Sequence, residues 1–288
     1  MDVTLYKDED CLAGSIHHFI DECVRISFRY EKGPFIVNPT KYFRRNSGKI
    51  TPAVVNSAEY FSKKFQNSLK ALGWEIDFTI EGQEIDGFIT YEAENELFAS
   101  IDEHHFYKQI AELDPRGKDF TKEVVLLHSM YFNRNKFIIK DIFNDSNFSI
   151  GDGSIDLRIG LEFETGNIAS SFRALSKLNN LYDMNQIDFG IFVTSMNKNS
   201  STKIWPSSNR NGSIEELENR KFEHEFRMPI MIYGFEPDGW DYTVGFLNKK
   251  GERYKIDGPT SKVAEKGKKF IYYEKHKLFK EIEYNMYQ

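Results

Sequence analysis

The segment from Ser154 to Glu164 reads SIDLRIGLEFE, and apolar residues alternate along it with polar or small ones. A period of two predicts a β-strand with one buried face. After Gly166-Asn167, apolar residues from Ile168 to Tyr182 recur at helical spacing, and Ile187 to Thr194, IDFGIFVT, form an apolar run of strand length. Such a run is typical of a strand buried on both faces. This stretch therefore predicts a strand, a helix and a buried strand in succession.

A helix and a hairpin are predicted upstream. Apolar residues recur at three- and four-residue steps from Pro52 to Leu72, and Gly73 follows where a helix would stop. Trp74 to Ile80 and Glu84 to Tyr91 alternate as strands around the turn Glu81-Gly82-Gln83. The order of these elements predicts an α/β (α+β) fold in which helices flank a central mixed β-sheet.

The remaining segments are read as additions to this core. We expect a short helix near 213–221, a strand at 229–235 and a hairpin around Asn248-Lys-Lys-Gly251. Residues 95–153 are interpreted as an insertion. The chain is predicted to be a single domain, 1–288, with its core at 54–94 and 154–236 and a peripheral C-terminal region at 237–288.

The composition is that of a globular protein. The 288 residues are 40% hydrophobic and 15% aromatic, with a formal net charge of −6; the mean hydropathy is −0.54. These values disfavour disorder, and no apolar stretch is long enough to span a membrane. With no signal peptide apparent, we expect a cytoplasmic protein whose two cysteines, Cys11 and Cys23, are core thiols and not a disulfide.

Three carboxylates are the candidates for chemistry. Glu162 and Glu164 are two apart on one strand and therefore share a face, and a neighbouring strand can bring Asp86 beside them. Such a cluster repels itself unless a hard cation neutralises it, and Mg²⁺ suits a set of carboxylates, waters and phosphate oxygens. Acidic pairs at this spacing are common by chance, so the pair carries weight only because of its place on the strand.

The segment IDLRIGLEFETGNIASSFRALSKLNNLYDMNQIDFGIFVTSM, preceded by a helix and by EIDGFI, resembles the core of PD-(D/E)xK nucleases. The resemblance is closest to type II restriction endonucleases of the BamHI and BglII kind, and it covers about residues 54–94 and 154–236. It implies a nuclease that acts on double-stranded DNA with Mg²⁺, as a homodimer on a short palindromic site.

The resemblance also implies roles for particular residues. Asp86 and Glu162 would bind the metal, and Glu164 stands where many relatives have lysine, as in the BamHI-like branch. Glu59 on the preceding helix would assist.

The short spacing usual in the family between the aspartate and the glutamate is missing here. Asp152 and Asp156 are therefore alternative metal-binding aspartates, although Asp156 should lie about 20 Å from Glu162 along one strand.

Contacts with DNA are predicted from charge and from the resemblance. Phosphate contacts are expected from basic stretches, because a chain of net charge −6 depends on local clusters of Lys and Arg. The family's loops approach DNA near Asn167, Asn209 and Arg210, and Arg can read guanine while Asn reads adenine. The basic candidates are Lys41, Arg44, Arg45 and the region from Lys249 to Lys280.

We interpret the sequence as that of a type II restriction endonuclease. Two alternatives remain open from the residues alone: another nuclease of the same fold that serves in repair or defence, and a non-catalytic protein-binding module.

Overall fold

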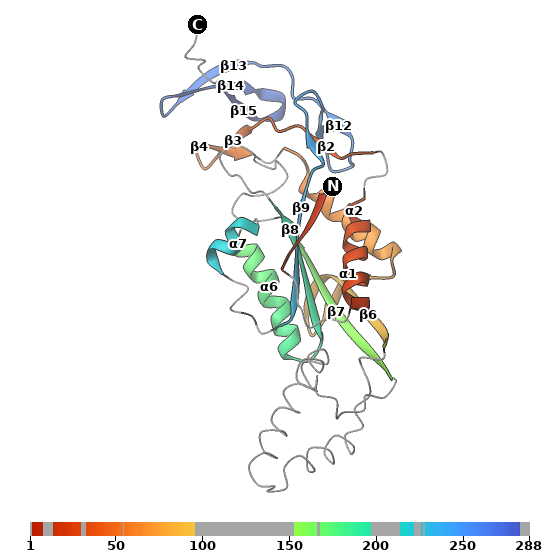
Figure 1. Cartoon of the computed structure of the whole chain (residues 1–288). Helices are drawn as coiled ribbons and strands as arrows, with labels where there is room; N and C mark the ends of the chain where they lie inside the picture. The colour runs from red at the N-terminus through yellow and green to blue at the C-terminus, as the bar shows by residue number, and fades with distance from the viewer. Residues whose placement is uncertain are drawn as a thin grey trace, which may run out of the picture.

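The structure is a computed structural model that describes residues 2–7, 14–29, 33–53, 55–95, 153–165, 168–196, 214–221, 226 and 228–282. Its centre is a six-stranded mixed sheet in the order β1-β9-β8-β7-β6-β5 (Figure 1). The strands are β1 (Asp2–Lys7), β5 (Glu75–Ile80), β6 (Gln83–Asn95), β7 (Gly153–Glu164), β8 (Phe189–Ser195) and β9 (Ile230–Glu236). β7, β8 and β9 are parallel, whereas β5, β6 and β1 run antiparallel to their neighbours.

Helices cover both faces of this sheet. On one face lie α1 (Gly14–Ser27) and α2 (Ala58–Ala71), and on the other lie α6 (Ile168–Asp183) and α7 (Ile214–Arg220) (Figure 1). Every residue of β8 is buried, as its uninterrupted apolar run predicts. The predicted α/β arrangement with a central mixed sheet is confirmed. None of the helices in the described part of the chain is long and apolar enough to cross a membrane.

The local signals in the sequence explain most of these elements. Glu81 and Gly82 both have positive φ, 48° and 74°, which is the conformation that a tight two-residue hairpin turn requires. α2 begins after Ser57, whose hydroxyl accepts a hydrogen bond from the Tyr60 N–H, and Gly73 follows its end with φ 92°. The hairpin and the end of the helix are confirmed.

The predicted start of that helix at Pro52 is wrong. Pro52 belongs to β4 (Lys49–Ala53), where it pairs with Phe43 of β3 (Tyr42–Asn46). The apolar residues that precede α2 serve this strand and not the helix.

β3 and β4 join the C-terminal region in a second sheet that the sequence did not predict. It has five strands in the order β13-β14-β15-β3-β4, and it lies beyond the end of the central sheet from which β9 leads into the C-terminal region (Figure 1). Its other strands are β13 (Ser261–Glu265), β14 (Lys268–Tyr273) and β15 (Leu278–Glu281).

Short strands connect the two sheets. β2 (Ile36–Val37) pairs with β10 (Gly239–Trp240), and β11 (Phe246–Leu247) pairs with β12 (Arg253–Tyr254) around the predicted 248–251 hairpin. Leu247 packs into the same core as α2, so the C-terminal region is attached to the core of the central sheet.

The two faces of β7 have different roles. Phe163 points into a cluster of aromatic rings formed with Phe28 of the segment after α1, Phe65 of α2 and Phe235 of β9, at centroid distances of 6.1, 5.0 and 5.3 Å. Glu162 and Glu164 point to the opposite face, because neighbouring residues of a strand alternate. Cys23 of α1 is buried on the aromatic side, where burial raises the pKa of its thiol. The predicted core position of Cys23 is confirmed, and Cys11 lies outside the described residues.

We expect Phe163→Ala to lower the free energy of unfolding by about 3–5 kcal/mol, because it removes a ring that touches three others and leaves a cavity. Urea unfolding monitored by circular dichroism measures this. Phe163→Leu, which retains most of the volume, should cost about half as much or less. Equal losses in both variants would show that ring packing is not what holds β7 in place.

Candidate active site

The ladder of backbone pairs between β6 and β7 ends at Gly87 and Leu161. At the next position of β6, the side chain of Asp86 contacts β7 in place of a backbone pair. Its Oδ2 accepts a hydrogen bond of 2.8 Å from the Phe163 N–H. Beyond this pair β6 and β7 separate like the arms of a fork, and the Asp86 carboxylate bridges them where they separate. Glu162 of β7 is the residue opposite Asp86. We call this place the fork.

Glu162 is a buried acid at this fork. Only 5% of the residue is exposed, and its Oε1 makes an ion pair with the ammonium of Lys177, which comes from α6. Lys177 also donates a hydrogen bond to the carbonyl oxygen of Glu84 on β6, so its side chain bridges the two strands of the fork.

Two polar residues surround Asp86 on the side of α2 and β5. The Gln66 amide donates hydrogen bonds to Asp77 at 2.9 Å and to Asp86 at 3.3 Å, and so links the two carboxylates. Asp77 has φ 51°, a left-handed conformation inside a strand that costs free energy for any residue with a Cβ. Strained residues of this kind concentrate at functional sites.

Glu164 stands at the end of β7, half-buried, beside Thr194 of β8 in the strand register. The Thr194 hydroxyl donates to the Glu164 carbonyl oxygen at 2.8 Å. The Glu164 carboxylate is close enough to Asp86 and Glu162 to raise the pKa of both. Asp86, Glu162 and Glu164 are thus close enough to influence one another electrostatically.

The raised pKa values of Asp86 and Glu162 show that ionising these two carboxyl groups is unfavourable. Burial is the main cause that raises the pKa of Glu162 to about 8, and the neighbouring charge of Asp86 adds to it, while Lys177 opposes the shift. Burial also raises the pKa of Asp86, against the Phe163 N–H and Lys177. Two adjacent acids that are both hard to ionise favour a cation between them.

The donor set suits a small hard cation. Among the residues that the structure describes, no three His, Cys, Asp or Glu side chains converge in the geometry of a complete metal cage. Mg²⁺ does not need one, because it keeps several waters and commonly takes only one or two protein carboxylates together with phosphate oxygens. Asp86 and Glu162 fit that requirement.

The structure does not bring Glu59 into this group. Glu59 sits in the first turn of α2 and forms ion pairs with Lys63 and Lys249, which lower the pKa of its carboxyl to about 2. Gln66, seven residues further along the helix and about 10 Å away, is the α2 residue that reaches Asp86. The assisting role of Glu59 stays a prediction that these contacts do not support.

The alternative aspartates stand elsewhere. Asp156 is opposite Glu92 in the β6–β7 register, six positions before Glu162 on one continuous strand. This spacing corresponds to roughly 20 Å, so the backbone favours Asp86 over Asp156. Asp152 lies outside the described residues, as do Asn167, Asn209 and Arg210.

The predicted basic cluster is divided by the alternation of β3. Arg45 forms an ion pair with Glu265 of β13 at 3.3 Å and lies over the Phe279 ring, 5.6 Å from its centroid. Arg44, the next residue, is exposed on the opposite face. Arg45 therefore has structural partners, whereas Arg44 faces solvent.

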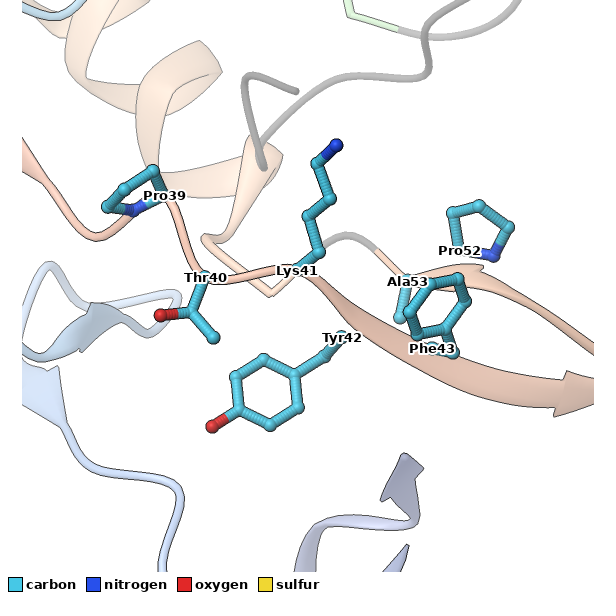
Figure 2. A pocket seen from close by; sticks show the side chains of 7 residues that line it. All are labelled: Pro39, Thr40, Lys41, Tyr42, Phe43, Pro52 and Ala53. Carbon is cyan, nitrogen blue, oxygen red and sulfur yellow. The ribbon is translucent and has the colours of Figure 1, made fainter. Parts of the chain in front are cut away.

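Lys41 lies just before β3. It lines a small, largely apolar pocket with Pro39, Thr40, Tyr42, Phe43, Pro52 and Ala53, where its side chain extends away from that of Tyr42 (Figure 2). The pocket holds no arrangement of acids or bases for catalysis, so Lys41 is a candidate for DNA contact only.

Arg44 shares its face with a group of lysines. The register pairs Lys262 with Ile271 and Ile271 with Lys280, which places both lysines on one face, and Lys269 projects from that face two residues before Ile271. The acids Glu265 and Glu281 occupy the other face, where they pair with Arg45 and Lys268. We name the exposed cations Arg44, Lys262, Lys269 and Lys280 the basic face.

Sequence reasoning missed Lys177, Gln66 and Asp77. Lys177 follows Ala174 at a helical spacing that reads as an ordinary boundary between buried and exposed positions. Gln66 and Asp77 resemble common surface residues. Only the tertiary arrangement shows that all three converge on the fork, and no short-range signal in the sequence identifies them.

The raised pKa of Glu162 makes stability depend on pH. The folded chain holds this proton more tightly than the unfolded chain, so unfolding releases it between pH 4.5 and about 8. Stability should therefore fall as pH rises through this window, and Glu162→Gln should flatten the fall. The measurement is urea unfolding in EDTA from about pH 5 to about pH 8.

Glu59→Gln is the control, because the pKa of Glu59 is lowered and its linkage lies at more acidic pH. It should leave the pH profile in this window unchanged. A profile for Glu162→Gln that runs parallel to that of the unsubstituted chain would contradict the electrostatic account of the site.

Comparison with known proteins bears directly on this site. Residues 7–231 match the model of a protein family described as restriction endonuclease BamHI. The matched span contains α2, the β5–β6 hairpin, β7, α6 and β8, and so includes every residue of the fork; β13, β14 and β15 lie outside it. No curated protein matches the sequence.

Proposed function

The chain belongs to the BamHI restriction endonuclease family, whose members cleave DNA at specific sites, and we propose that it does so with Mg²⁺ bound by Asp86 and Glu162 and as a homodimer. Nucleases of this family typically use a divalent metal. The observation that carries the proposal is the buried acid pair at the fork between β6 and β7. Such a pair is costly unless a cation shares it, and Lys177 reaches only one of the two acids with an ion pair.

The residues of the fork have distinct roles in this proposal. Asp86 is fixed by the Phe163 N–H and by Gln66, so one of its oxygens is oriented by each neighbour. Glu162 supplies the second carboxylate, and Glu164 at the strand end orients water toward the scissile phosphate. When bound, the metal would stabilise negative charge on that phosphate and lower the pKa of the attacking water.

A homodimer follows from the symmetry of the substrate. One fork can cut one strand, so cleavage of both strands of a palindromic site is performed most directly by two copies related by the two-fold axis of the DNA. Asn167, Asn209 and Arg210 remain our candidates for reading the bases, because the sequence places them in polar segments that follow β7 and β8 along the chain.

We expect Asp86→Asn and Glu162→Gln to reduce cleavage by at least about a hundredfold, since each removes a ligand charge from the metal that stabilises the transition state. Binding to DNA in Ca²⁺ should persist, because neither change removes a cation. The assay is digestion of plasmid and phage DNAs of known sequence with Mg²⁺ or EDTA, alongside gel shifts.

Asp156→Asn is the matched control and should cleave at the rate of the unsubstituted chain. Full activity in Asp86→Asn together with loss in Asp156→Asn would move the metal to the other aspartate. Digestion by all variants in EDTA would refute a metal-dependent mechanism.

The basic face generates a second prediction. We propose that it binds phosphates, and each phosphate that a side chain neutralises contributes about one to the slope of log K against log salt. Replacing Lys262, Lys269 and Lys280 by Ala should therefore lower the magnitude of that slope by about one for each phosphate left without its cation. Fluorescence anisotropy with labelled DNA in Ca²⁺ measures it.

Lys268→Ala is the control on the opposite face, where Lys268 already pairs with Glu281 at 2.8 Å. It removes one lysine charge from the same sheet and should leave the slope nearly unchanged. Equal slopes for the triple variant and the unsubstituted chain would mean that the basic face is only a solvated surface.

A further inference from the structure

Lys177 occupies the opening of the fork. Its ammonium contacts Glu162 on β7 and the Glu84 carbonyl oxygen on β6, at the point where the backbone pairing of the two strands has ended. The Lys177 side chain is 28% exposed, whereas that of Glu162 is 7% exposed. A single cation from α6 thus reaches from solvent to a buried acid that we assign to the metal.

We propose that Lys177 is a built-in competitor of the divalent cation: it shares Glu162 with the metal and thereby sets how tightly the site binds it. The inference rests on the proposed function, because it takes Glu162 as a metal ligand. It adds a positioning residue from a helix that the sequence did not connect with the site.

A bound metal and the Lys177 ammonium would repel each other. A metal ion bound by the Glu162 carboxylate lies within a few ångströms of any ammonium that contacts the same carboxylate. Two cations at that separation repel strongly in a partly buried site, where the effective dielectric constant is about 20. The metal must therefore displace Lys177 from Glu162 or be held more weakly beside it.

The ion pair of Lys177 with Glu162 rests on fewer contacts than another partly buried ion pair of the same sheet. Arg158 and Asp188 are joined by two side-chain hydrogen bonds of 2.9 and 3.0 Å, and the Arg158 N–H adds a third of 3.1 Å. Three hydrogen bonds therefore hold Arg158 against Asp188. Lys177 and Glu162 are joined only by the ion pair to Oε1, and a lysine side chain can swing on its flexible stem.

Lys177 also has a second partner on the other arm of the fork. Glu84 offers a neutral carbonyl oxygen there, so the ammonium has an acceptor that does not require Glu162. Lys177 can release the carboxylate and stay at the opening, where a phosphate of the substrate would meet its charge.

Metal binding tests the inference without cleavage. Titration with Mn²⁺, with free Mn²⁺ followed by its electron paramagnetic resonance signal, gives the affinity of the folded protein. We expect Lys177→Met to bind Mn²⁺ roughly tenfold more tightly, because a repelling charge is gone. Lys177→Arg retains the charge and should stay within about twofold of the unsubstituted chain.

Two further variants keep the test decisive. Arg173→Met removes a cation from the same helix, one that donates to Ser170 at 3.1 Å, and should not alter the Mn²⁺ affinity. Lys177→Gln replaces Lys177→Met if the latter does not fold, since its amide can still donate to the Glu84 carbonyl oxygen. Circular dichroism verifies folding for each variant.

The outcomes separate the inference from the function on which it rests. Unchanged or weaker Mn²⁺ binding in the neutral variant that folds would overturn the role of Lys177 while leaving the metal site intact. If Mn²⁺ binding is the same in Glu162→Gln as in the unsubstituted chain, the metal assignment itself is wrong, and the inference is overturned with it.

Discussion

The hydrogen bond from the Phe163 N–H to the Asp86 carboxylate is the interaction on which the site depends. It replaces a backbone pair at the point where β6 and β7 separate, so a side chain holds the two strands together there. Phe163 is held from the other side by aromatic packing with α2 and β9. Because strand residues alternate, the packing that fixes Phe163 also fixes Glu162 and Glu164 on the opposite face. Three consecutive residues of β7, Glu162, Phe163 and Glu164, therefore contribute to the aromatic core on one face and to the acid group on the other.

Much of the central sheet could be predicted because its signals are local. The alternation in SIDLRIGLEFE, the apolar run IDFGIFVT and the turn at Gly82 each depend on neighbours in the chain. Asp86 and Glu162 could be paired for the same reason: each was placed on a strand, and the resemblance to a nuclease family suggested adjacency. Family membership over residues 7–231 agrees with that resemblance.

The parts that escaped prediction depend on contacts between distant segments. β3 and β4 look like a basic loop and the start of a helix until β15 pairs with β3 and β3 pairs with β4. Arg44 and Arg45 look equivalent in sequence, yet only Arg45 pairs with Glu265, which approaches on a strand near the other end of the chain. Lys177 likewise becomes notable only when α6 packs over the fork.

The pairing of Phe43 with Phe279 has a consequence for the order of folding. A ribosome delivers β3 and β4 early, whereas β15, which pairs with β3, is synthesised only much later. Contacts of such large sequence separation form slowly, and the unpaired edge of β3 stays open until they do. The basic face is complete only after β15 has paired with β3, because Lys280 lies on β15 and Arg44 on β3. The growing chain can therefore assemble its acid fork before the basic face is complete.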